Sequence, residues 1–202
     1  SFEVTAANPA MTIIVPASPV TPNTTAEIKV VVGKNATKSV IIYVNGEANV
    51  VPVDADGNAT LTINNIQPGE KVITAEYFGD ANYNSATGGP SQFNVSKYEP
   101  SITWNATVKD NHNVTFTFTF HNKTATGNVT VKVGDKNYTV AIKDGVAAVN
   151  VGILNVTDNQ RVFVANYSGN PLFNSKLIDV NATIGKLANG TMKVEITTPT
   201  DS

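Results

Sequence analysis

The dominant pattern along this chain is an alternation of hydrophobic and polar residues with a period of two. Residues 26–32 (AEIKVVV) place Ile28, Val30 and Val32 on one face, with Glu27 and Lys29 on the opposite face. Residues 114–120 (VTFTFTF) repeat the pattern with four apolar residues on one face and three threonines on the other. A period of two indicates half-buried strands, and no segment shows the period of a helix. The sequence therefore predicts an all-β fold, with the residues Val114, Phe116, Phe118 and Phe120 facing a core.

Turn signals separate the strands at intervals of about 8–12 residues, the spacing typical of a β-sandwich. Asn45-Gly46 is a strong hairpin signal, Asp56-Gly57 predicts a second turn and Pro68-Gly69 a third. The strands expected in the first half of the chain are residues 11–15, 26–32, 40–44, 50–53, 59–63, 71–78 and 92–96.

The second half of the chain repeats the first. Residues 75–85 (AEYFGDANYNS) return as residues 165–175 (ANYSGNPLFNS), and five of these eleven positions are identical. A repeat of about 90 residues indicates two copies of one small sandwich. We expect domain 1 at residues 1–97, domain 2 at 98–185, and at 186–202 either the first strand of a further repeat or an added edge strand. Because the junction at residues 95–101 has no glycine, we expect two domains held end to end in a semi-rigid rod.

Composition excludes several classes of function. The chain has 202 residues, 41% of them hydrophobic, but only 15% charged, with a formal net charge of -2. No basic field is available to attract nucleic acid, and no apolar run in this segment is long enough for membrane insertion. The chain has no cysteine, which excludes disulfides and thiolate zinc sites.

Asparagine and threonine are unusually frequent, at 25 residues each. The N-glycosylation pattern Asn-x-Ser/Thr occurs 13 times, about threefold more often than this composition predicts by chance. Polar residues on the outer face of a strand also repeat every second position, so alternation alone remains an alternative. The candidate acceptors are Asn23, Asn35, Asn58, Asn94, Asn105, Asn113, Asn122, Asn128, Asn137, Asn155, Asn166, Asn181 and Asn189.

The motifs at residues 40–46, 54–61, 68–69 and 75–85 resemble those of bacterial-type Ig-like repeats. The Asn/Thr richness and low charge are similar to those of adhesin-like surface proteins of methanogenic archaea. The resemblance covers both copies and is stronger in the first, since the second has Asn170-Pro171 for Asp80-Ala81. It implies two tandem Ig-like β-sandwiches of about seven strands each, extracellular at a cell surface and beside neighbouring repeats of the same kind. It brings no catalytic residues and no cofactor.

The repeated turn is the first candidate contact site, because its polar and aromatic residues suit a sugar or a protein surface. Candidate ligand contacts there are Asp80, Asn82, Tyr83, Asn170 and Phe173. The alternative is that Tyr77 and Tyr83 anchor the turn by packing. For the single tryptophan, Trp104, we expect a core position.

Catalytic and metal sites are poorly supported. His112 and His121 have no partner at a recognisable spacing, so we expect solvated histidines. Asp54, Asp56 and Asp80 have the residue type for calcium, but residues 54–58 lack the distal glutamate of an EF-hand, and Asp56-Gly57 is a turn signal. Lys29 with Asn94 and Glu27 has the residue types of an intramolecular isopeptide bond, although the alternation points all three outward.

These observations favour a non-enzymatic segment of a cell-surface adhesin or stalk that mediates or positions cell adhesion. Its partner would be a surface protein or a glycan of another cell. The alternative is a pair of carbohydrate-binding modules attached to a surface or secreted enzyme, which an exposed row of aromatic side chains would favour.

Overall fold

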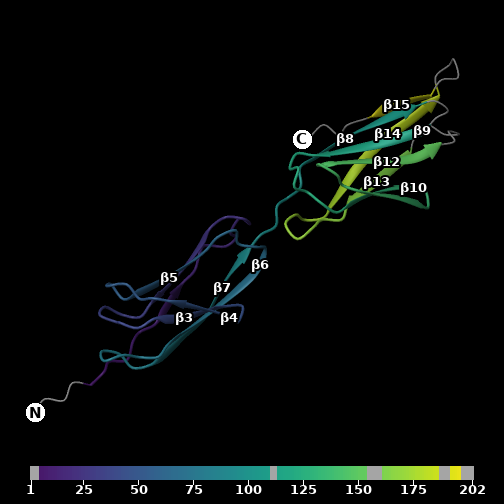
Figure 1. The fold of residues 1–202 in the computed structure, drawn as a ribbon. Coiled ribbons are helices and arrows are strands. Elements are labelled where there is room, and N and C mark those ends of the chain that lie inside the picture. Colours follow the sequence, from purple (N-terminus) through teal and green to yellow (C-terminus); the bar gives the residue numbers. More distant parts are fainter. Residues whose placement is uncertain (1–4, 110–112, 154–160, 187–191, 197–202) are drawn as a thin grey trace, which may run out of the picture. The chain divides into compact units, whose positions relative to one another are not determined.

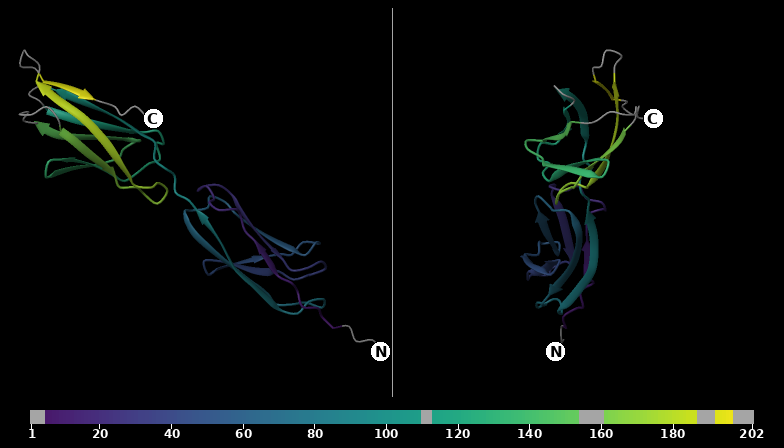
Figure 2. Two further views of the ribbon diagram at one scale, coloured as in Figure 1. Left: turned by 180° about the vertical axis from the view of Figure 1, so that it is seen from behind. Right: turned by 90° about the vertical axis from the view of Figure 1, so that its right-hand side faces the viewer.

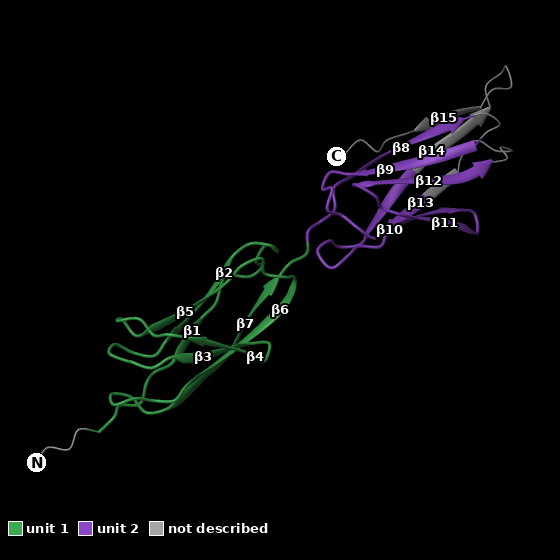
Figure 3. Ribbon diagram, viewed as in Figure 1, with its two compact units in different colours: residues 1–97 green, residues 98–202 purple. Residues whose placement is uncertain are grey.

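The computed structural model describes residues 5–109, 113–153, 161–186 and 192–196, with the backbone alone for residues 161–163, 181–186 and 192–196. The chain divides into two compact units, Ser1–Lys97 and Tyr98–Ser202 (Figure 3). Each unit consists of two layers of antiparallel strands (Figures 1 and 2). The predicted all-β sandwich fold is therefore confirmed. Nothing in the described part of the chain forms a helix with the length and apolar character needed to cross a membrane.

The first unit has a three-stranded sheet in the order β1-β2-β5 and a four-stranded sheet in the order β4-β3-β6-β7. Its strands are β1 Thr12–Ile14, β2 Ala26–Val31, β3 Val40–Val44, β4 Glu47–Val51, β5 Asn58–Ile63, β6 Gly69–Tyr77 and β7 Ala86–Val95. The predicted hairpin at Asn45-Gly46 is confirmed, because both residues have a positive φ, 50° and 86°, and join β3 to β4. This tight turn keeps β4 in the sheet of β3, and the chain then crosses to the other sheet as β5.

The second unit repeats this arrangement. It pairs a three-stranded sheet, β12-β9-β8, with a five-stranded sheet, β11-β10-β13-β14-β15. The last strand lies outside β14, with Ala182 paired to Ile196 and Lys186 to Met192. The strands are β8 Ile102–Lys109, β9 Asn113–Phe120, β10 Asn128–Val133, β11 Lys136–Ala141, β12 Val146–Ile153, β13 Arg161–Tyr167, β14 Lys176–Lys186 and β15 Met192–Ile196.

Each unit has its own hydrophobic core, built from the faces that the alternation predicts. In the first unit Ile28, Val30 and Val32 are at most 2% exposed. In the second unit the predicted inward set on β9 is confirmed, since its four members are between 0% and 3% exposed. Trp104 is half-buried and packs against this core, with its ring 6.3 Å from that of Phe116. Each sandwich therefore closes over its own apolar residues.

The predicted start of the seventh strand was wrong. The sequence pattern placed the last strand of the first unit at residues 92–96. The structure instead begins β7 at Ala86 and carries it through these residues, with a shift of the pairing register between Ile73 and Ala75. Gly89 makes this irregularity possible: its φ is +94°, and a Cβ there would lie 2.6 Å from the carbonyl oxygen of Ile73.

Candidate functional site

In the first unit the repeated turn between β6 and β7 is organised by the carboxylate of Asp80. Its Oδ2 accepts hydrogen bonds from the Tyr77 hydroxyl at 2.7 Å and from the backbone N–H and hydroxyl of Thr37 at 2.7 and 2.8 Å. Its Oδ1 accepts from the N–H groups of Asn82 and Tyr83 at 2.7 and 2.8 Å. The hydrogen bond from Tyr77, together with those from Thr37 and the turn, holds the pKa of Asp80 well below its usual range. The carboxylate therefore connects the turn to the segment between β2 and β3.

The neighbouring residues of the turn reinforce the same connection. The Asn82 side chain donates to the carbonyl of Asn35 at 2.8 Å, and the Tyr83 hydroxyl donates to the carbonyl of Lys34 at 2.9 Å. The Tyr83 ring lies so close to Gly33 that a Cβ at that glycine would stand 2.7 Å from the hydroxyl oxygen. The structure thus brings the candidates Asp80, Asn82 and Tyr83 together, with hydrogen bonds directed into their own unit.

The second unit builds the corresponding turn with an amide in place of the carboxylate. Asn170 Oδ1 accepts from the N–H groups of Leu172 and Phe173 at 2.8 and 2.7 Å, while its Nδ2 donates to the Thr126 hydroxyl at 3.0 Å. The hydroxyl of Tyr167 donates to the carbonyl of Thr126 at 2.9 Å. Burial raises the pKa of Tyr167, as it does that of Tyr77 in the first unit. Phe173 is only 3% exposed, so this candidate belongs to the core.

Each turn also holds the segment that leads into its own unit. Ala7 forms a parallel bridge with Tyr83, and Tyr98 forms one with Phe173. In the first unit the Ala7 N–H donates to Asn82 at 2.9 Å and the Asn84 N–H donates to Ala7 at 2.8 Å. The second unit repeats both backbone bonds at Tyr98, at 2.8 and 2.9 Å.

The asparagine that both copies share in this turn completes the attachment. The side chain of Asn84 donates to Asn8, and that of Asn174 donates to the carboxylate of Glu99. Sequence reasoning missed this role, because both partners lie more than 70 residues away along the chain. The only signal was the identity Asn84/Asn174 together with a proline at equivalent positions, Pro9 and Pro100.

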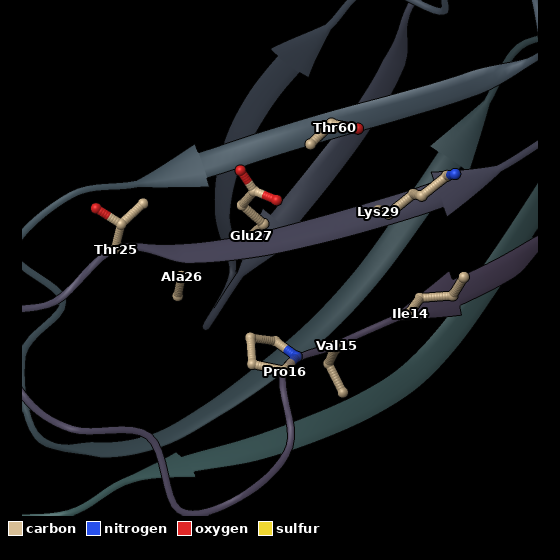
Figure 4. Close-up of a pocket in the computed structure, with 8 residues that line it drawn as sticks. All are labelled: Ile14, Val15, Pro16, Thr25, Ala26, Glu27, Lys29 and Thr60. Atoms are coloured by element: carbon tan, nitrogen blue, oxygen red, sulfur yellow. The ribbon is translucent and has the colours of Figure 1, made fainter.

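A shallow open depression of about 740 Å³ lies where β1 ends beside β2 (Figure 4). Its lining combines an apolar side from Ile14 to Pro16 with the polar residues Glu27 and Lys29. Lys29 and Glu27 lie on β2 of the three-stranded sheet, whereas Asn94, the third isopeptide candidate, is exposed on β7 of the other sheet. The structure therefore separates Lys29 from Asn94.

The aspartates of the β4–β5 turn bond locally. Asp54 Oδ1 accepts from the N–H groups of Asp56 and Asn58, each at 2.9 Å. The hydrogen bond from the Asn58 backbone is the main cause that lowers the pKa of Asp54. Among the described residues no group of three or more His, Cys, Asp or Glu side chains is placed to hold a metal ion. His121 is exposed after β9, and His112 lies outside the described residues.

The described asparagines of the Asn-x-Ser/Thr pattern all reach the surface. Asn155 and Asn189 lie outside the described residues, as does the side chain of Asn181. Asn58 and Asn113 are half-buried at the starts of β5 and β9. The exposed ones are Asn23, Asn35, Asn94, Asn105, Asn122, Asn128, Asn137 and Asn166.

Comparison with known proteins gives one family match, which covers residues 11–96 and is described as a bacterial Ig-like domain (group 3). No curated protein matches the chain. Among solved structures, the chain is similar to fibronectin(III)-like modules of CbhA from Clostridium thermocellum, at 11% identity and a TM-score of 0.34, over 84% of this chain and 93% of that one. It is also similar to a 1.5-MDa bacterial ice-binding adhesin, at 14% identity and a TM-score of 0.32, over 95% of this chain and 65% of the adhesin chain. A third similar structure is that of titin domains z1z2, at 14% identity and a TM-score of 0.40, over 88% of this chain and 98% of that one. Residues 11–96 of the first unit therefore match the model of the bacterial Ig-like domains of group 3, the family that its turn motifs resemble.

Proposed function

We propose that this chain is a non-enzymatic segment of an extracellular cell-surface adhesin or stalk, in which Ig-like units mediate or position cell adhesion. The observation that carries the proposal is the path of the chain through the first unit. The leading segment is attached at Ala7 to the turn that precedes β7, and the chain leaves the unit from the far end of β7 at Val95. A ten-residue strand spans roughly 30 Å, so the chain crosses the unit from one end to the other. A repeat crossed in this way adds length to an array, which is the requirement of a spacer.

The hydrogen bonding of the repeated turn supports a structural rather than a catalytic role. A catalytic acid or base needs a free lone pair or proton directed at a substrate. The Asp80 carboxylate instead accepts five hydrogen bonds from its own unit, and the Asn170 amide is likewise engaged within the second unit. These groups hold loops in place, and a module that transmits force or acts as a spacer requires such fixed loops.

A carbohydrate-binding module is the second candidate, and one observation favours it. Phe78 is 66% exposed, beside a shallow depression of about 420 Å³ lined by Glu76, Ser85 and Thr87. An exposed ring next to polar groups is suited to stack against a sugar. Among the aromatic side chains that the structure describes, Phe78 alone is this exposed, whereas a polysaccharide platform requires a row of rings.

Surface labelling of intact cells tests the first proposal. An antibody raised against the 202-residue chain is applied to unpermeabilised cells of the source organism, with and without prior treatment by an external protease. Labelling that the protease removes supports surface exposure. Labelling that appears only after permeabilisation contradicts it.

A depletion assay separates the two candidates. The chain is mixed with insoluble polysaccharides, and the protein left in solution is measured for the wild type and for Phe78→Ser, which copies the residue of the second unit at this position. Depletion that the substitution abolishes would replace the stalk proposal with carbohydrate binding. Equal recovery of both proteins supports the stalk.

A further inference from the structure

The outer face of the larger sheet differs between the two units, although its strands β4-β3-β6-β7 in the first unit correspond in order to β11-β10-β13-β14 in the second. In the first unit Ile41 on β3 lies between Val50 on β4 and Glu76 on β6. Exposed apolar residues lie on this face: Val50 is 70% exposed, and Phe78 continues the face beyond the end of β6. Beside them, the Tyr43 hydroxyl donates to the Glu76 carboxylate at 3.0 Å. The pattern Asn-x-Ser/Thr meets this sheet only near the end of β7, at Asn94.

The second unit has polar residues at the same positions. Thr130 on β10 takes the place of Ile41 and lies between Thr139 on β11 and Asn166 on β13. The two threonine hydroxyls are hydrogen-bonded to each other at 2.8 Å. In the next row Lys132 lies between Asn137 and Val164.

Thr130 completes an Asn-x-Ser/Thr pattern with Asn128 on β10, and the other replacements create two more on the flanking strands. Asn137 and Thr139 stand where the first unit has Ala48 and Val50, and Asn166 and Ser168 stand where it has Glu76 and Phe78. Residues two apart on a strand point to the same face, so Asn137 and Thr139 on β11 share the outer surface. Ser168 follows the end of β13, where its hydroxyl accepts from the Asn128 N–H at 3.0 Å and donates to the Gly169 carbonyl at 3.1 Å. Asparagine is disfavoured inside strands, and its presence on both strands that flank β10 is therefore not explained by strand formation.

The surroundings of both asparagines suit a covalent attachment. Both side chains are exposed. Neither side-chain amide makes a hydrogen bond within the described part of the chain, whereas Asn113 and Asn122 accept bonds from Asn150 and Thr124. Since β11 and β13 flank β10 and the two asparagines are offset by two residues along it, they stand roughly 12 Å apart. A short glycan on each would overlap over β10.

We propose that Asn137 and Asn166 are N-glycan acceptors whose glycans cover the outer face of the five-stranded sheet, while the corresponding face of the first unit stays bare. The co-reactant is an oligosaccharide joined through its anomeric carbon to a lipid phosphate, and a transferase catalyses the step. The asparagine Nδ2 forms a bond to the anomeric carbon as the bond from that carbon to the phosphate oxygen breaks. The lipid phosphate leaves with the electron pair, and Nδ2 loses one of its two protons. This inference rests on the extracellular placement proposed above.

Site occupancy is the first test. The 202-residue chain is secreted from a eukaryotic cell line that performs N-glycosylation, and its peptides are analysed by mass spectrometry before and after enzymatic release of glycans in H₂¹⁸O. We expect most molecules to be modified at both asparagines, and Asn137→Gln and Asn166→Gln each to remove one glycan from the intact mass. A secreted, folded chain that is unmodified at both positions overturns the proposal. Because this host modifies the chain whatever its native location, a failure of surface labelling in the source organism remains a separate result.

Surface footprinting is the second test, because a glycan that is present but points away would cover nothing. The glycosylated chain and the enzymatically deglycosylated chain are compared by hydroxyl-radical labelling. We expect Val164 and Leu177, which are 41% and 71% exposed, to be labelled less in the glycosylated chain. Val50 and Phe78 of the first unit should be labelled equally in both. Equal labelling of Val164 and Leu177 in the two forms overturns the covering role.

The chain provides a matched gain-of-glycan variant. The double substitution Ala48→Asn and Val50→Thr writes the pattern of β11 into β4 of the first unit. We expect the secreted protein to gain the mass of one glycan and the labelling of the neighbouring Ile41 to fall. A variant that is secreted but stays unmodified, while Asn137 is occupied, contradicts the equivalence of the two faces on which the inference depends.

Discussion

Truncating Phe118 to alanine should destabilise the second unit severely and leave the first unit folded. Phe118 is 0% exposed in the middle of β9, where it lies opposite Trp104 on β8 and Ala147 on β12. Because β9 is the central strand of its sheet, neighbours on both sides and the facing sheet prevent the site from collapsing. Truncation of a buried phenylalanine costs about 3–5 kcal/mol, and a site that cannot collapse belongs at the upper end of that range. A domain of this size has a free energy of unfolding of roughly 5–10 kcal/mol, so the variant retains at most about half of it.

Equilibrium unfolding in urea measures this loss. Trp104 is the only tryptophan and packs on the core of the second unit, so its fluorescence reports on that unit alone. For a slope of about 1–1.5 kcal/mol per M, the midpoint should fall by roughly 2–4 M. Thr119→Ala, at the exposed position next to Phe118, serves as the matched control and should change stability by no more than about 0.5 kcal/mol.

Val30 occupies the position of Phe118 in the first unit and provides a second control. Val30→Ala should leave the Trp104 transition where it is, because the two hydrophobic cores share no residue. If Phe118→Ala leaves the Trp104 transition unmoved while Thr119→Ala shifts it, the threonine face of β9 is the buried one and the assignment of the core fails.

Three further predictions concern the turns. The folded-state pKa of Asp80 lies below the value of about 3.9 for an unfolded aspartate, so its contribution to stability is present above that pH and is lost as the pH falls further. In calorimetry, Asp80→Asn should therefore reduce the fall in the first unit's melting temperature as the pH is lowered below about 4. A fall as large as in the wild type would contradict the role assigned to this carboxylate. Gly57 and Gly46 have similar φ values of +82° and +86°, but a Cβ at Gly57 would lie 1.9 Å from a carbonyl oxygen, whereas a Cβ at Gly46 would meet nothing within 4 Å. In equilibrium unfolding, Gly57→Ala should therefore destabilise the first unit by at least about 1–2 kcal/mol more than Gly46→Ala. Equal losses of stability would show that φ alone matters. Asn174→Ala removes the side-chain bond to the leading segment of the second unit, worth about 1 kcal/mol, so the amide of Tyr98 should exchange its hydrogen roughly fivefold faster, and an unchanged rate would show that the backbone bridge suffices.

The local sequence predicts the strands and their buried faces because both depend on neighbours in the chain. The alternation at 114–120 identifies the inward set of β9, and Asn45-Gly46 identifies a hairpin, since its positive φ values suit few other residues. The start of β7 is different. The sequence predicted only residues 92–96 of this strand, whereas pairing with β6 extends the strand back to Ala86 through a bulge.

The sequence shows that the turn is repeated, but it does not show which residues the turn contacts. Asp80 is followed by the two N–H groups that it accepts from, which is a local pattern. Its bonds to Thr37 span 43 residues, and the attachment of Asn84 to Asn8 spans 76. Such contacts follow from the packing of loops at one end of a sandwich, which sequence spacing does not encode. The two-copy comparison gave the only signal, in the residues that both turns keep.

The free edge of the last long strand, β7 in the first unit and β14 in the second, is protected differently in the two units. This protection affects how readily neighbouring molecules can join through their sheets. A strand edge with unpaired N–H and C=O groups is a template for pairing with the same strand of a neighbouring molecule. In the first unit the edge of β7 is interrupted by the bulge at residues 88–90 and is bridged by Val20 at Val95. In the second unit β15 pairs with the last five residues of β14, and β15 is itself only five residues long and includes Lys193 and Glu195. Many copies packed side by side would therefore meet at edges that resist joining into a shared sheet, so that dense display need not lead to aggregation.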